Sequence, residues 1–273
     1  MALDQLDDKT EMGFLDHLEE LRWHLVRSVI AIAVLMITAY LFREYIWDVV
    51  ILGPTESDFW TYRKLCELSE ILRSPALCLE EIPMSLQNRE ITGQFVMSIT
   101  SSAVIGLVVA FPYVFWEIWR FVKPGLRSAE RSASRGAVLV VSFLFLTGVA
   151  FGYFIIAPLS INFLANFTLS DKIQDLIDIK SILNMLVTLS LACGFMFQLP
   201  VVSYFLTKAG LASPAVMKRY RKHAFVAILV ISAIITPPDV MSQILIAIPI
   251  IGLYEVSIVV SRRVEKSTEK KNA

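Results

Sequence analysis

Charged residues are scarce in this chain. Asp, Glu, Lys and Arg together make up 18 % of its 273 residues, whereas a soluble globular protein has about 25 %. Hydrophobic residues reach 56 %, so too few polar side chains remain to cover a surface exposed to water. The 25 basic and 25 acidic residues cancel, which leaves no net basic charge for a nucleic-acid partner. This composition argues against a disordered chain and a cytosolic enzyme, and it predicts an integral membrane protein.

Motifs for catalysis or metal binding are also missing. The sequence has no GxxxxGK[ST] phosphate-binding loop, no HExxH zinc pair and no GxSxG nucleophile elbow. Its three histidines, His17, His24 and His223, form no ligand cluster in the sequence. We therefore expect no enzymatic activity and no cofactor. The acidic residues that precede Leu25 also argue against a cleavable signal peptide, which would begin with positive charge.

Long apolar stretches are the main feature that the sequence does have. A helix needs roughly 20 apolar residues to cross the roughly 30 Å of hydrocarbon in a bilayer. Six stretches are candidate spans, at residues 25–43, 95–116, 136–157, 182–206, 220–235 and 243–260. The fifth is the weakest candidate, because its length corresponds to only about 24 Å of helix. The fifth and sixth stretches are either two short spans, which we favour, or a re-entrant hairpin.

The distribution of Lys and Arg predicts how these spans are oriented. Basic residues concentrate between the second and third spans, between the fourth and fifth, and after the sixth. Because such loops stay in the cytoplasm, we expect both termini there, with a polar tail at residues 265–273. The predicted fold of residues 1–264 is an all-α domain of six transmembrane helices in a bacterial cytoplasmic (inner) membrane. Prolines bend or end helices and predict a concave bundle, with Pro112, Pro158, Pro200 and Pro249 at the relevant positions.

The predicted loop at residues 44–93 is the largest segment outside the spans. Its periodicity indicates one short helix that ends before Pro75. Cys66 and Cys78 lie in this loop, on the oxidising side of the membrane if the cell has a periplasm. A disulfide between them would stabilise the loop by about 3 kcal/mol. The alternative is two reduced cysteines packed on an amphipathic surface, and the spacing does not decide between the two.

Residues 1–24 include an acidic amphipathic segment that leads into the first span. Asp16 and Glu20 stand at positions i and i+4, so they fall on one helical stripe and repel each other. Membrane flanks on the cytoplasmic side normally carry Lys and Arg. A solvated acidic face is one interpretation of this stripe. A cationic ligand is the other, and it would also explain the unusual position of the acids.

A second polar segment follows the second span. It combines aromatic residues suited to the membrane interface, a Pro–Gly turn and an acid beside bases. Its residues of interest are Phe121, Pro124, Gly125, Leu126, Glu130 and Arg131. Glu130 is either a surface ion-pair partner of its basic neighbours or a ligand residue.

Five short motifs occur in order along the chain. They lie at residues 17–22 (His-Leu-Glu-Glu-Leu-Arg), 119–131, 148–158, 197–200 (Phe-Gln-Leu-Pro) and 236–243. The first resembles the HLxELR signature of the TatC family, the multispanning subunit of the twin-arginine protein translocase. The second resembles the first cytoplasmic loop of that family, and the others resemble its third span, fourth span and last hairpin. The resemblance covers almost the whole chain.

This resemblance implies a function and a set of partners. The family recognises signal peptides that carry a paired Arg-Arg motif on folded cargo proteins. It recruits single-span partner subunits of the TatA and TatB type, and the proton-motive force drives transport. We also expect contacts with membrane lipid and with other copies of the chain, and none with nucleic acid.

By residue match, Glu20 and Glu130 would receive the two arginines of the signal peptide. A carboxylate binds a guanidinium group bidentately, so each acid could take one arginine. Phe121 and Leu126 would pack the hydrophobic residues that follow the arginines. The full predicted set is Glu20, Arg22, Phe121, Pro124, Gly125, Leu126, Glu130 and Arg131, in which the two arginines would orient or neutralise the acids.

Two glutamines are predicted to act within the membrane. Gln198 stands just before Pro200, where the family often has Glu, and this neutral side chain still forms hydrogen bonds. A polar group at that depth is costly unless it faces protein or water. Gln198 either contacts a partner helix or the cargo's signal helix, or it makes a helix–helix hydrogen bond within the subunit. Gln243 is predicted to lie at a partner interface.

The remaining predicted residues are structural. Gly148 and Gly152 would allow two helices to approach closely, and the full structural set is Gly148, Gly152, Pro158, Pro200, Pro237, Pro238 and Asp239. The alternative function is a small-molecule secondary transporter, which would have paired broken helices and an ion site at the midplane. Pro200 and Pro249 fit that pattern, but the short fifth and sixth spans do not mirror the first two.

Overall fold

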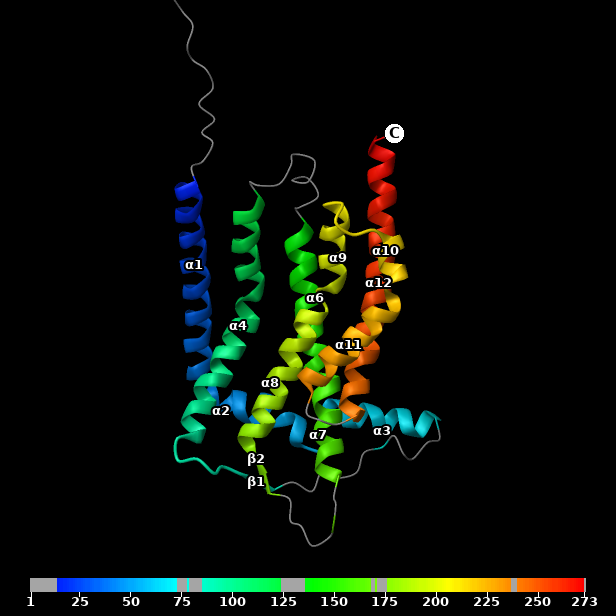
Figure 1. The fold of residues 1–273 in the computed structure, drawn as a ribbon. Coiled ribbons are helices and arrows are strands. Elements are labelled where there is room, and N and C mark those ends of the chain that lie inside the picture. The colour runs from blue at the N-terminus through cyan, green and yellow to red at the C-terminus, as the bar shows by residue number, and fades with distance from the viewer. Residues whose placement is uncertain are drawn as a thin grey trace, which may run out of the picture.

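The protein is a row of upright helices (Figure 1). The computed structural model describes residues 14–72, 78, 85–123, 136–167, 170, 176–236 and 240–272. Within them, five helical segments are long and apolar enough to cross a membrane: Glu19–Leu41, Gly93–Val122, Ala137–Asn166, Ile179–Lys208 and Ser242–Ser267. The start of α1 and the end of α12 both lie at the top of Figure 1, and we call this side of the helices the terminal end. The all-α membrane architecture predicted from the sequence is confirmed.

Helices α1 (Phe14–Leu41) and α4 (Gly93–Val122) form an antiparallel pair at one edge of the row (Figure 1). Gly106 lets them touch near their middle, because a Cβ added there would lie 2.7 Å from the backbone nitrogen of Met36. α4 extends six residues beyond the predicted end of the second span at residue 116. Pro112 lies inside α4 and does not end it.

The central helices are each built from several segments. α6 (Ala137–Phe151), η6 (Gly152–Ile156) and α7 (Ala157–Asn166) follow one another without a gap, so the helical path continues past Pro158. α8 (Ile179–Met196) and α9 (Leu199–Lys208) are separated at residues 197–198, next to Pro200. The ring of Pro200 cannot donate a backbone hydrogen bond, which agrees with this break. An apolar hollow of about 260 Å³ lies between α4, α6 and α8.

The opposite edge of the row contains α10 (Pro214–Arg219), α11 (Arg221–Ile235) and α12 (Val240–Asn272). α11 has 15 residues, which is about 22 Å of helix. It is therefore shorter than the hydrocarbon layer, as expected for the fifth stretch. α12 continues to Asn272, through most of the polar tail that we delimited at residues 265–273, and Pro249 lies inside it. Buried residues of η6, α8 and α12, including Ile156, Leu189 and Ile246, form the main core.

The segments between α1 and α4 lie at the end opposite the termini. They include α2 (Arg43–Tyr45), η1 (Ile46–Ile51), η2 (Gly53–Thr55) and α3 (Trp60–Leu72). α3 is the helix predicted in the long loop. Its Tyr62 is 3 % exposed and donates to the carbonyls of Pro54 and Pro158, both at 2.9 Å, which ties the loop to α7. Burial raises the pKa of Tyr62 well above the usual value, so the hydroxyl remains a donor at neutral pH.

A short parallel sheet joins two distant loops at the same end. β1 (Ser85–Gln87) pairs with β2 (Leu176–Asp178), with Ser85 opposite Leu176. No alternating pattern in the sequence predicted these three-residue strands. The pairing connects the segment before α4 to the segment before α8, so it links the N-terminal ends of these two helices.

Candidate functional site

The residues predicted to bind a signal peptide are only partly described by the structure. Glu20, Arg22 and Phe121 lie on α1 and α4. The other five lie outside the described residues: Pro124, Gly125, Leu126, Glu130 and Arg131. The segment that holds these five begins directly after α4, so the end of this helix delimits where the site begins.

Glu20 is exposed near the terminal end of α1. Its carboxylate has no ion-pair partner among the described residues. Arg22, two residues further on, lies over the ring of Trp23 with 5.5 Å between the guanidinium carbon and the ring centroid. Within the described part of the chain, Arg22 therefore does not neutralise Glu20.

Phe121 lies in the last turn of α4 and faces α1. Its ring meets the ring of His24 edge-on, with centroids 6.2 Å apart. His24 stands four residues after Glu20, which is one helical turn on the same stripe of α1. The structure therefore brings two of the predicted ligand residues, Glu20 and Phe121, to the same end of one helix pair.

A polar cluster around the buried carboxylate of Glu117 lies directly below these residues, and the sequence analysis missed it. It consists of His24 on α1 with Glu117 and Tyr113 on α4. The distance from Nδ1 of His24 to Oε2 of Glu117 is 2.5 Å, and the hydroxyl of Tyr113 donates to Oε1 of Glu117 at 2.8 Å. The Glu117 side chain is only 1 % exposed and that of His24 15 %.

The sequence analysis placed the end of the second span before Glu117, which made this residue a loop acid. In the structure α4 continues past residue 116 and buries the side chain of Glu117 against α1. A signal for this was present in the sequence. Tyr113, Glu117 and Phe121 follow at intervals of four, which places them on one stripe of a helix.

The two glutamines lie on other helix pairs. Nε2 of Gln198 donates to the carbonyl of Val141 on α6 at 3.2 Å, so it makes a helix–helix hydrogen bond within the subunit. Its Oε1 is buried without a partner among the described residues. Nε2 of Gln243 on α12 donates to the carbonyl of Leu229 on α11 at 3.1 Å. Gln243 is distant from Glu20, since α12 and α1 stand at opposite edges of the row (Figure 1).

The residues predicted to be structural lie mostly in the centre of the molecule. A Cβ on Gly148 would lie 2.6 Å from the carbonyl oxygen of Cys193, and one on Gly152 would lie 2.7 Å from Cα of Ser190. α6 and η6 therefore touch the backbone of α8. Pro158 and Pro200 are buried at the starts of α7 and α9. Pro237, Pro238 and Asp239 lie outside the described residues.

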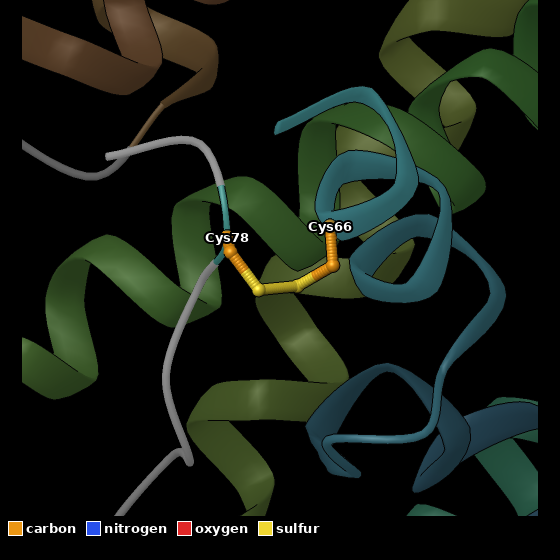
Figure 2. Close-up of a disulfide and its surroundings, with 2 residues drawn as sticks. All are labelled: Cys66 and Cys78. Carbon is orange, nitrogen blue, oxygen red and sulfur yellow. A yellow bond between two sulfur atoms is a disulfide. The ribbon is translucent and has the colours of Figure 1, made fainter. Parts of the chain in front are cut away.

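The structure contains a disulfide between Cys66 and Cys78. Figure 2 shows this bridge between Cys66 on α3 and Cys78. Cys193 is a buried free thiol on α8. No group of three or more His, Cys, Asp and Glu side chains suited to a metal ion occurs in the described part of the chain.

These features define a multi-pass helical membrane protein with exposed acidic residues at the terminal end of α1. Residues 16–249 match the family model described as Sec-independent protein translocase protein (TatC). The chain is 38 % identical over 262 residues to the TatC protein of Blattabacterium sp. subsp. Periplaneta americana, covering 95 % of this chain and 98 % of the relative. It is 35 % identical over 255 residues to TatC of Desulforapulum autotrophicum, covering 93 % and 86 % respectively.

The fold leads to the same family. A crystal structure described as the twin-arginine translocase receptor TatC superposes with a TM-score of 0.70 at 30 % sequence identity, covering 91 % of this chain and 99 % of that one. The chain belongs to the TatC family. It is a multi-pass membrane component of a Sec-independent protein translocase and not an enzyme. Family membership leaves the transporter alternative without support.

Proposed function

We propose that this chain is the receptor for signal peptides with a paired Arg-Arg motif, and that the peptide binds at the terminal end of α1 and α4. In this proposal the terminal end faces the cytoplasm, as the distribution of Lys and Arg predicts. The observation that carries the proposal is the exposed carboxylate of Glu20, which lacks an ion-pair partner among the described residues. It lies beside the end of α4, where the segment with Glu130 begins.

The chemistry of the site suits guanidinium groups. A carboxylate and an arginine form two parallel hydrogen bonds, whereas a lysine ammonium acts as a point charge. Glu20 would take one arginine and Glu130 the other. The half-buried ring of Phe121 offers an apolar surface for the hydrophobic residues that follow the pair.

Binding of two peptides to the purified protein tests this proposal. One peptide carries Arg-Arg and the other Lys-Lys at the same positions. We expect the Arg-Arg peptide to bind more tightly, and Glu20→Gln to weaken it by about tenfold or more, since a charged hydrogen bond contributes about 1.5–3 kcal/mol. Glu19→Gln is the matched control, because Glu19 is also exposed but lies on a different stripe of α1. Equal binding of both peptides, or an unchanged affinity in Glu20→Gln, would contradict the proposal.

We further propose that the edge formed by α11 and α12 recruits single-span subunits of the TatA and TatB type, with Gln243 as the polar contact. Polar side chains stabilise helix association in lipid, and Gln243 is half-buried with the apolar residues Leu229 and Ile244 beside it. Crosslinking to a single-span subunit should fall in Gln243→Leu, while Ile244→Ala on the exposed neighbouring position leaves it unchanged. Undiminished crosslinking in Gln243→Leu would exclude this role.

A further inference from the structure

The cluster of His24, Glu117 and Tyr113 has no part in the proposed peptide contacts. Its hydrogen bonds nevertheless satisfy both oxygens of a buried carboxylate. A buried carboxylate is costly unless it is paired and hydrogen-bonded. Both oxygens of Glu117 have partners, one on α1 and one on α4. Arg27 on α1 adds a positive charge that acts on the same carboxylate. With 1 % of its side chain exposed, Glu117 is too deeply buried to contact a peptide.

The location of the cluster relates it to the proposed site. On α1, Glu20, His24 and Ser28 form one stripe, and Ser28 is 6 % exposed against α4. On α4, Phe121 stands four residues beyond Glu117. Because the two helices are antiparallel, Glu20 and Phe121 both lie one turn, about 6 Å along the axis, from the His24–Glu117 link toward the terminal end.

The closest approach of the backbones of α1 and α4 fixes the two helices at one point along their interface. Gly106 brings α4 against Met36 of α1 near the middle of the pair. Glu117 stands 11 residues further along α4, which is about 16 Å of helix. Above Gly106, apolar packing would let the helix ends shift or rotate, whereas a hydrogen bond between two buried side chains is directional. The His24–Glu117 link therefore supplies the second fixed point.

We propose that His24 and Glu117 are positioning residues for the signal-peptide site. Their link fixes the spacing and rotation of α1 against α4, so that Glu20 and Phe121 stand where one peptide contacts both. This inference rests on the proposed function. Tyr113 orients the carboxylate from within α4, and the ring of His24 supports Phe121 directly.

Two substitutions of Glu117 separate positioning from folding and from direct binding. Glu117→Leu removes the buried carboxylate, and His24, with 15 % of its side chain exposed, and the exposed Tyr113 lose their partner. The melting temperature should therefore fall, and peptide binding is compared on the folded protein. Glu117→Gln has nearly the same shape and can accept from Tyr113 while its amide donates to neutral His24. We expect Glu117→Leu to bind the Arg-Arg peptide about tenfold more weakly and Glu117→Gln to bind within about twofold of the wild type.

Spin labels at Glu19 and Lys123, both exposed, report the geometry directly. The distance distribution between them should be narrow in the wild type and in Glu117→Gln, and broader or shifted in Glu117→Leu. Glu255→Leu is the matched control. It removes the carboxylate that pairs with Arg221 between α11 and α12, and it should change neither the distribution nor peptide binding.

A double variant in which His24 and Glu117 exchange places keeps the test decisive if Glu117→Leu does not fold. His24→Glu alone places two carboxylates together and should weaken binding, and adding Glu117→His rebuilds the link in reverse and should restore it. Wild-type affinity in Glu117→Leu overturns the inference, as does a loss in Glu117→Gln with an unchanged distance distribution. Glu20→Gln in the same assay distinguishes the two failures: if it has no effect, the proposed function fails, and if it alone weakens binding, only the positioning role fails.

Discussion

The helix pairs α6–α8 and α1–α4 are held together in different ways. α6 and η6 approach α8 through Gly148 and Gly152, with added Cβ atoms 2.6–2.7 Å from its backbone. Next to these glycines, Phe145 and Leu189 are completely buried. The α1–α4 pair has one comparable contact, at Gly106, and a buried polar link near its terminal end.

The two kinds of contact have different effects: one stabilises the fold, and the other fixes how two helices are placed against each other. Close backbone packing gains dispersion energy along a whole interface, which suits a core that does not need to change. A buried charged link gains little net stability, but it favours one arrangement over its neighbours. The molecule has such a link beside the proposed site, which indicates that the exact placement of Glu20 and Phe121 matters there. Another ion pair between helices within the described ranges, Arg221–Glu255, is about 40 % exposed and contributes little.

The largest expected effect comes from filling the glycine contact of the packed pair. Gly148→Ala should lower the free energy of unfolding by about 2–3 kcal/mol through overpacking, measured as thermal unfolding in detergent. Gly252→Ala on α12 is the control, because its added Cβ meets nothing within 4 Å. Peptide binding by the folded Gly148→Ala protein should be unchanged. Equal melting temperatures for the two variants would show that α6 and α8 are not in backbone contact.

An effect of similar size, but confined to α3, is expected from the disulfide between Cys66 and Cys78. Reduction of Cys66–Cys78 should destabilise α3 by about 2–3 kcal/mol, because the closed loop is short. Hydrogen exchange should accelerate in α3 and stay unchanged in α1 and α4. In Cys66→Ser, the amides of α3 should exchange as fast as in the wild type with its disulfide reduced, and adding reductant should change nothing. Uniform acceleration across the molecule would contradict the local character of this bridge.

The sequence predicted the helices well because their signals are local. An apolar stretch long enough to cross a bilayer can be recognised from its own length and composition. The helix α3 was predicted from the periodicity around Tyr62. The boundaries were less predictable. α4 and α12 continue into polar segments, because a helix that already has several turns adds residues at little cost.

The candidate site was only partly predictable, because some of its contacts join residues that are far apart in the sequence. Glu20 stood out because an acid at a cytoplasmic membrane flank is unusual. Glu117 did not, because its partner His24 is 93 residues away and only the packing of α1 on α4 brings them together. The β1–β2 pairing was missed likewise, since three-residue strands have no periodicity that a sequence can display.

The most direct test of this account is the affinity of the purified protein for the Arg-Arg and Lys-Lys peptides, measured in the wild type, Glu20→Gln and Glu117→Leu. The account predicts that the wild type prefers Arg-Arg. It also predicts that both variants lose about tenfold in affinity for that peptide, although Glu117 is buried out of its reach. No preference in the wild type, or wild-type affinity in both variants, would contradict the account.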